Sequence, residues 1–139
     1  MLTKSDDSFE IRLRNAEGVP VLQLCGTVTK AALRTVKSTL DRLARAGHYN
    51  IVLNVEQAQT SNWGFLSALA GTVRKIRAHY GAVELVASQD RIEQLLGAGP
   101  AARLFRLCRS ERQAIFRIKR LQRQPDGLSD VNARLLEQS

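Results

Sequence analysis

The segment from residue 50 to 81 constrains the fold most, because a short apolar run leads through a polar stretch into a helical pattern. The run Ile51–Val55 has the length and β-branched composition of a buried strand. Apolar residues then recur at helical spacing and predict a helix from about Gly64 to His79, which stops near Gly81. A polar loop over Gln57–Asn62 joins the two, next to a helix N-terminus that offers unpaired N–H groups. The expected inward positions of the helix are Phe65, Leu69, Val73, Ile76 and Tyr80.

The rest of the chain alternates strands and helices in the same way, after an opening hairpin around Glu17-Gly18. This order predicts an α/β fold, a mixed sheet of four to five strands with about four helices packed mainly on one face. Residues 1–123 are assigned to this domain, and residues 124–139 to a C-terminal tail that forms a short helix or is disordered. The other predicted elements are strands at Phe9–Leu13, Val19–Cys25, Val83–Ala87 and Leu104–Leu107, and helices at Lys30–Ala46, Gln89–Leu96 and from Ser110 to about Gln122.

Composition favours a single globular domain, since the 139 residues are 44% hydrophobic and hold no run of about 18 apolar residues. The N-terminal residues lack the apolar segment of a signal peptide, so we expect a cytoplasmic protein. Cys25 and Cys108 are expected to be reduced and mostly buried thiols. No close Cys/His spacing predicts a metal site, and no motif calls for a cofactor.

The formal net charge of +8 leans toward the C-terminal part, where residues 100–139 hold nine basic and four acidic residues. Such an excess favours acidic partners, nucleic acid or an anionic surface, or it forms a solvated helix face. Few aromatic residues accompany the charge, so a base-stacking platform is not predicted and nucleic acid is not the expected partner. The basic residues concerned are Arg103, Arg106, Arg109, Arg112, Arg117, Lys119, Arg120 and Arg123.

From about Phe9 to Leu121 the chain resembles the STAS domain family, which includes the anti-sigma factor antagonists of bacteria and the stressosome proteins. The resemblance rests on the order and spacing of several pieces rather than on any one of them. These pieces are the strand end Leu24-Cys25-Gly26, the strand Ile51–Val55, the helix Gly64–His79, Gly81, and the stretch IEQLLGAGPAARLFRL with Leu95, Gly99 and Phe105 as landmarks.

The chain departs from this family at the phosphorylation motif, an Asp-Ser-Ser-Gly or Asp-Ser-Thr-Gly sequence at the start of the second helix. Without gaps, Asn62 stands at the Asp position, Trp63 at the phosphoacceptor, Gly64 at the second Ser and Phe65 at the Gly. Trp63 has no hydroxyl and cannot be phosphorylated. A shift by one residue places Ser61 at the Asp position and Asn62 at the acceptor, which again supplies no phosphoacceptor.

The resemblance implies a partner-binding surface at the loop and the N-terminus of the second helix. We assign it to Gln59, Thr60, Ser61, Asn62, Trp63 and Gly64. Trp63 is either a core residue that fills the gap between helix and sheet or an interface anchor. Ser61 and Thr60 are weak phosphorylation candidates. The alternative is that their hydroxyls only form hydrogen bonds in the loop or cap the helix N-terminus.

The sequence thus predicts a non-enzymatic bacterial regulatory module that binds a protein partner, an anti-sigma factor, a kinase or a sensor protein, without the usual serine phosphorylation. The sequence leaves open whether the protein forms a homodimer. The alternative is a nucleic-acid or anionic-surface binding module that uses the C-terminal Arg/Lys face. An enzyme is not expected, because no nucleophile–base pair, metal spacing or glycine-rich phosphate loop is found.

Overall fold

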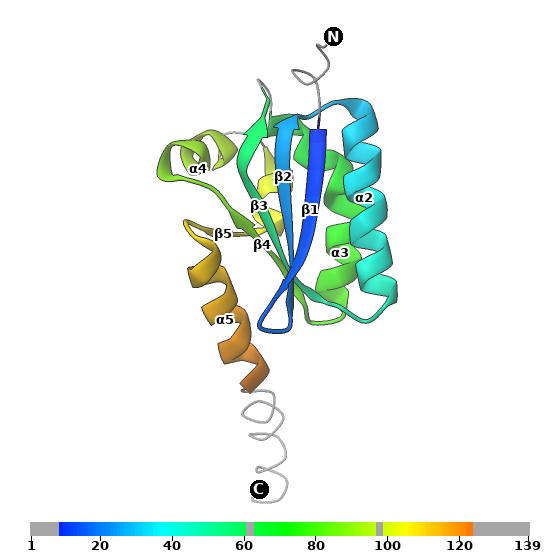
Figure 1. Ribbon diagram of the computed structural model, residues 1–139, viewed down its shortest axis with the longest axis vertical. Coiled ribbons are helices and arrows are strands. Elements are labelled where there is room, and N and C mark those ends of the chain that lie inside the picture. Colours follow the sequence, from blue (N-terminus) through cyan, green and yellow to red (C-terminus); the bar gives the residue numbers. More distant parts are fainter. Residues whose placement is uncertain (1–8, 61–62, 97–98, 124–139) are drawn as a thin grey trace, which may run out of the picture.

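The computed structural model describes residues 9–60, 63–96 and 99–123 (Figure 1). The predicted tail, residues 124–139, lies outside them. The elements are, in chain order, β1 (Phe9–Ala16), β2 (Val19–Thr27), α2 (Lys30–Arg45), β3 (Asn50–Gln59), the 3₁₀ helix η1 (Trp63–Leu69), α3 (Ala70–Ala78), β4 (Ala82–Val86), α4 (Gln89–Leu96), the 3₁₀ helix η2 (Pro100–Leu104), β5 (Arg106–Cys108) and α5 (Glu111–Arg123).

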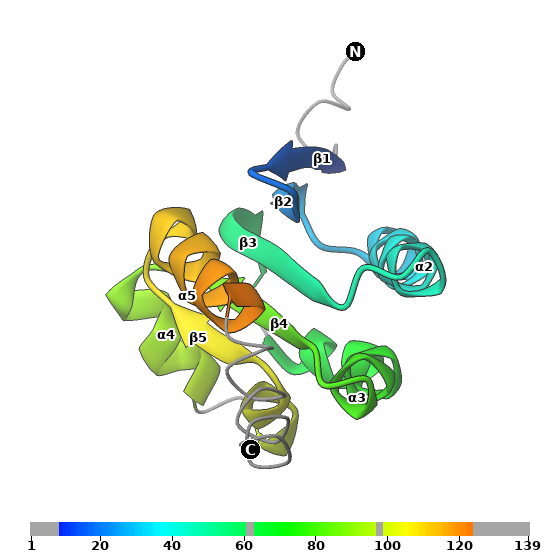
Figure 2. The same cartoon turned by 90° about the horizontal axis from the view of Figure 1, so that it is seen from below.

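The five strands form one sheet in the order β1-β2-β3-β4-β5. The hairpin partners β1 and β2 are antiparallel, whereas β2 to β5 run parallel to one another. Figure 2 shows α2 and α3 side by side on one face of the sheet and α5 on the opposite face. The mixed α/β sheet predicted from the sequence is therefore confirmed.

Local residue chemistry explains where the first elements turn and end. Glu17 (φ 56°) and Gly18 (φ 88°) form the two-residue hairpin turn, a left-handed pair that matches the twist of the strands. At the start of α2, the hydroxyl of Thr29 accepts a hydrogen bond of 3.1 Å from the N–H of Ala32. Gly47, with φ 92°, follows the end of α2 in a conformation that suits glycine. Both ends of α2 are thus set by neighbouring residues.

Two clusters of buried side chains lie on the two faces of the sheet. The larger cluster joins the sheet to α2, η1 and α3, with Val36, Leu40, Leu53 and Ile76 fully buried. The smaller cluster lies under α5 and contains Val19, Val21, Val52, Val86, Cys108, Ala114 and Ile118. Strand alternation sends neighbouring residues of β3 to opposite clusters. In the described part, no helix is long and apolar enough to cross a membrane.

Three local expectations were wrong. The region expected as a loop from Gln57 is still strand, because β3 continues to Gln59. The second helix begins as a 3₁₀ helix and becomes α-helical only at Ala70. Tyr80, expected to face inward, is 98% exposed with φ 63°, because the helix has already ended at Ala78.

Candidate functional site

The candidate site lies where the parallel strands β2, β3 and β4 end and the following helices begin, at the upper edge of the sheet in Figure 1. In open parallel sheets, ligands and partners bind at this edge, since connections there run from strand ends into helix N-termini. The N–H of Val28 donates to the carbonyl oxygen of Gln59 at 3.0 Å, which joins the ends of β2 and β3.

A bulge shapes the last part of β3. Gln23 pairs with Asn54 but Cys25 pairs with Gln57, so β3 has one extra residue opposite Leu24. The side-chain oxygen of Asn54 accepts from the N–H of Glu56 at 2.9 Å inside this bulge. The bulge changes the alternation, so that Ala58 points into the core while Gln57 and Gln59 are exposed. The exposed glutamines therefore come from a strand rather than from a loop.

Arg91 on α4 reaches across to this bulged strand. Its guanidinium donates to the carbonyl oxygen of Ala58 at 2.7 Å and to that of Val55 at 3.4 Å. These carbonyls belong to the irregular part of β3, where ladder hydrogen bonds are disturbed. The sequence analysis did not single out Arg91, because an isolated arginine on a short helix gives no pattern.

The structure brings the described members of the predicted binding surface together at this edge. Gln59 ends β3 and is exposed, Thr60 follows it and is half-buried, and Gly64 is half-buried in η1. Ser61 and Asn62 lie outside the described residues. Trp63 is the first residue of η1, of which only the backbone is described.

Glu56 is a further polar residue at this edge that the sequence analysis missed. It is half-buried, and within the described part of the chain its Oε2 is buried without a hydrogen-bond partner. An acceptor oxygen withheld from water needs a donor, and an unmatched one costs free energy. Only the strand bulge brings this side chain to the site, and a bulge leaves no recognisable signal in a single sequence.

The C-terminal basic residues do not form one free surface. Within α5 and its surroundings, the guanidinium groups of Arg106 and Arg117 each lie 3.3 Å from a carboxylate oxygen of Glu84, which is fully buried. Lys119 donates to the carbonyl oxygen of Glu17 at 3.0 Å. Three of the eight cations assigned to the alternative nucleic-acid surface thus hold α5 and β5 in place.

The two cysteines are free thiols, with Cys25 half-buried and Cys108 buried. The Sγ of Cys108 donates to Glu84 Oε1 at 2.9 Å. Burial and, after it, this hydrogen bond and the negative charge of Glu84 raise the pKa of Cys108 to about 12. Such a thiol stays protonated at neutral pH and is a poor nucleophile. Among the described residues, no three His, Cys, Asp or Glu side chains are grouped as metal ligands.

Comparison with known proteins agrees with this architecture. A family model described as the STAS domain matches residues 10–114. A search of curated protein sequences finds no match.

Solved structures of the same fold include an anti-sigma factor antagonist from Mycobacterium paratuberculosis, with a TM-score of 0.66 at 18% identity over 81% of this chain and 96% of that one. They also include the anti-sigma factor antagonist SpoIIAA in its unphosphorylated form, with a TM-score of 0.60 at 18% identity over 81% and 98%. The Bacillus cell fate determinant SpoIIAA in the phosphorylated form has a TM-score of 0.58 at 16% identity over 80% and 99%. The family model spans most of the chain, and the protein therefore belongs to the STAS domain family.

Proposed function

We propose that this STAS-family protein is a non-catalytic regulatory module that binds a protein partner through the carboxyl edge of its sheet. The surface consists of the end of β3 and the start of η1, from Gln59 to Gly64. The partner is an anti-sigma factor, a kinase or a sensor protein, the classes with which the family resemblance is associated. The observation that supports this proposal is the position of Gln59, Thr60 and Gly64 at the carboxyl edge of a sheet whose fold is that of anti-sigma factor antagonists.

Two features of the edge support a binding role. The first is the 3₁₀ helix η1, whose seven residues exceed the usual length of three or four and give the start of the second helix an unusual backbone geometry. The second is the buried Oε2 of Glu56, for which we expect a donor from the partner. Because this atom is already withheld from water in the free protein, a donor that reached it in the complex would recover about 1–3 kcal/mol, which favours partners that supply one.

Regulation, in this proposal, does not use the phosphoserine of the family motif. The structural relative SpoIIAA is known in phosphorylated and unphosphorylated forms. Here Asn62 and Trp63 stand where the motif has Asp and Ser. We expect mass spectrometry of the protein from its native cells to find Thr60 and Ser61 unmodified. A phosphate on either hydroxyl, in a fraction that changes with growth conditions, would overturn this part.

Trp63 is the residue on which the binding proposal is most directly tested. Trp63→Ala should weaken the complex by more than about 1 kcal/mol, because tryptophan is enriched among interface anchors. The affinity for the partner recovered from native cells is measured by titration calorimetry. Tyr80→Ala is the matched control, since Tyr80 is an exposed aromatic residue beyond the other end of α3 and should leave affinity unchanged. Unchanged affinity in a Trp63→Ala protein that still folds would count against this surface.

A further inference from the structure

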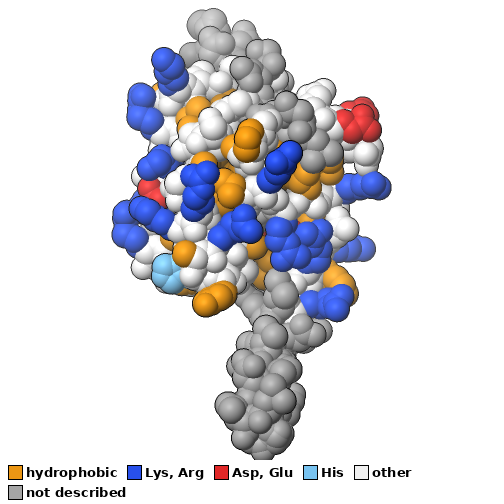
Figure 3. Space-filling view, turned by 180° about the vertical axis from the view of Figure 1, so that it is seen from behind, with side chains coloured by type: hydrophobic (Ala, Val, Ile, Leu, Met, Phe, Trp, Pro, Cys, Tyr) orange, Lys and Arg blue, Asp and Glu red, His pale blue; other side chains and the backbone are white. Residues whose placement is uncertain are grey.

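The positive charge of the chain is concentrated on the two helices that cover one face of the sheet. Together α2 and α3 carry eight basic residues and one acidic residue, a net charge of +7. The remainder of the 139-residue chain, with thirteen basic and twelve acidic residues, is nearly neutral. Lys and Arg side chains extend over the back of the molecule in Figure 3, where α2 and α3 lie at the left. The sequence analysis, which followed the excess into the C-terminal part, missed this concentration.

The cations on α2 form a row on its outer side. Lys30, Arg34, Lys37 and Arg45 are all exposed and lie within a narrow arc of the helix, opposite its buried residues. From Lys30 to Arg45 the row extends for about 22 Å at 1.5 Å per residue. Cations in the last turn of a helix interact favourably with the helix dipole. That effect does not account for Lys30, Arg34 and Lys37, which lie in the first half of α2.

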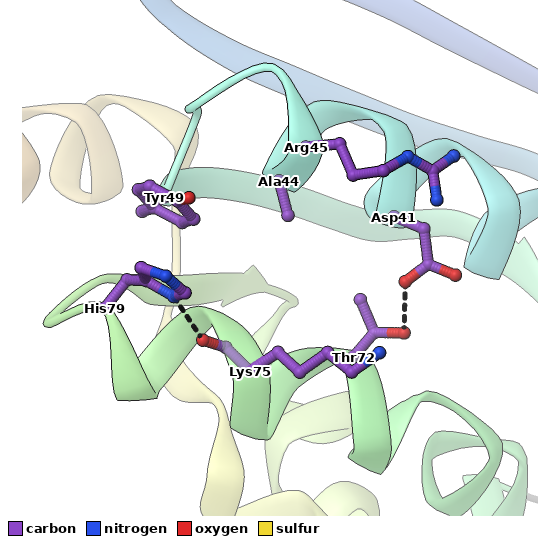
Figure 4. A pocket seen from close by; sticks show the side chains of 7 residues that line it. All are labelled: Asp41, Ala44, Arg45, Tyr49, Thr72, Lys75 and His79. Carbon is purple, nitrogen blue, oxygen red and sulfur yellow. Dashed lines mark hydrogen bonds between the residues drawn. The ribbon is translucent and has the colours of Figure 1, made fainter.

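Two hollows follow this row. One, of about 470 Å³, is lined by Arg34, Lys37, Ser38, Asp41 and Arg45 of α2. The other, of about 260 Å³, lies between α2 and α3 (Figure 4). The two hollows share the lining residues Asp41 and Arg45 and therefore adjoin, and we call the pair the trough.

The walls of the trough between the helices are fixed by contacts among the lining residues. Thr72 donates to Asp41 Oδ1 at 2.8 Å, which joins α3 to α2. The rings of Tyr49 and His79 stack with centroids 4.3 Å apart at the end of the trough that is drawn at the left in Figure 4. Asp41 is the one acidic residue here, and its charge is engaged by Thr72 and by Lys37 at 3.5 Å. Among the described residues, Arg34 and Arg45 are exposed and form no ion pair. Lys75 extends toward Thr72 (Figure 4), and its charge acts on Asp41.

We propose that this basic face, defined as Lys30, Arg34, Lys37, Arg45 and Lys75, binds the sugar–phosphate backbone of duplex DNA. A row of cations along a trough complements a rod of regularly spaced phosphates. A protein partner is less well matched, since the cores of protein interfaces are depleted in charged residues, lysine included, and are enriched in aromatic anchors. Among the described residues of α2 and α3, no large apolar side chain is exposed.

The same surface indicates that the bound DNA is double-stranded and that its base sequence is not recognised. Single strands are bound by stacking bases on exposed aromatic rings, which the two helices do not offer in their described residues. In a duplex the bases are already stacked and the phosphates face outward. From the sequence, nucleic acid was not expected as a partner, because few aromatic residues are available to stack on bases. Contacts with phosphates do not require such stacking. The hydroxyl of Ser38, exposed beside the cations, adds a donor to phosphate.

The test is fluorescence anisotropy with a labelled duplex of about 20 base pairs at about 50 to 200 mM salt. The wild-type protein should bind, with log K falling against log salt at a slope of about −3 to −5. The variant Arg34→Gln/Arg45→Gln/Lys75→Gln should bind at least tenfold more weakly, with a shallower slope. Arg34→Lys/Arg45→Lys should keep most of the affinity, because backbone contacts need charge more than geometry.

The matched control removes the same charge elsewhere. Arg109, Arg112 and Arg120 are exposed on the β5–α5 side of the chain, and their combined change to Gln should alter affinity less than twofold. Melting curves establish that each variant is folded. No binding by the wild type at the lowest salt would overturn the proposal, as would equal losses in the two triple variants. It is also overturned if anionic lipid vesicles or polyglutamate bind the wild type while the duplex does not.

Discussion

At the scale of single residues, the fold places Cys25 and Cys108 in different environments, although the sequence predicted the same state for both. Cys108 is buried beside Glu84, and its pKa is raised to about 12, whereas Cys25 is half-buried on β2. Thiolate is the reactive species, so iodoacetamide at about pH 8 should modify Cys25 at least about tenfold faster than Cys108. Peptide mass spectrometry over time measures both rates. In urea the two rates should become similar, and equal rates in the folded protein would contradict the described burial.

At the scale of elements, the first turn of α5 is held to the sheet by Glu111. Arg14 on β1 donates to both of its carboxylate oxygens at 2.7 Å, and Asn54 on β3 donates to Oε2 at 2.6 Å. Burial alone would raise the pKa of Glu111, but the hydrogen bonds from Arg14 and Asn54 and the charge of Arg14 outweigh it, and the pKa is lowered.

The lowered pKa of Glu111 determines how its contribution to stability depends on pH. The folded state favours the carboxylate, so Glu111 contributes stability above the ordinary pKa of about 4.5, and the contribution is lost as pH falls through the folded value. Glu111→Gln should therefore lower the free energy of unfolding at pH 7 and make its decline below about pH 4.5 shallower than in the wild type. Urea unfolding at several pH values measures this, with Glu93→Gln on the exposed side of α4 as the control. Parallel pH curves for Glu111→Gln and wild type would rule out the anchoring role.

At the scale of the whole molecule, the sequence predicts those parts of the fold that local chemistry determines. The Thr29 cap, the Glu17-Gly18 turn and the Ser110 cap, whose hydroxyl accepts from the N–H of Gln113, need only neighbouring residues, and all three are present in the structure. Helical spacing correctly identified Leu69, Val73 and Ile76 as buried. These features predict the order of the elements, and the order in turn predicts a mixed sheet.

The remaining differences come from tertiary structure that a periodic pattern does not record. The bulge opposite Leu24 changes the phase of β3, so the polar stretch after Val55 looked like a loop although it is strand. A 3₁₀ helix has three residues per turn, which brings Leu66 beneath the same face as Leu69 and leaves Phe65 half-buried. The basic face was missed for a similar reason, because its cations come from two helices that only the sheet brings together.

The two buried clusters predict how the molecule opens. The cluster under α5 is much the smaller, and no strand follows α5 in the described chain, so we expect α5 to detach in an opening that leaves the sheet, α2 and α3 intact. Leu40→Ala in the larger cluster should destabilise the protein by about 3 kcal/mol and speed exchange of α2 and β3 amides. It should leave α5 exchange unchanged, because Leu40 keeps its contacts while α5 is detached. Ile118→Ala removes contacts that this opening breaks, so it should speed α5 exchange more than about tenfold. Native-state hydrogen exchange measures both variants, and acceleration of α5 amides by Leu40→Ala would mean that the two faces open as one unit.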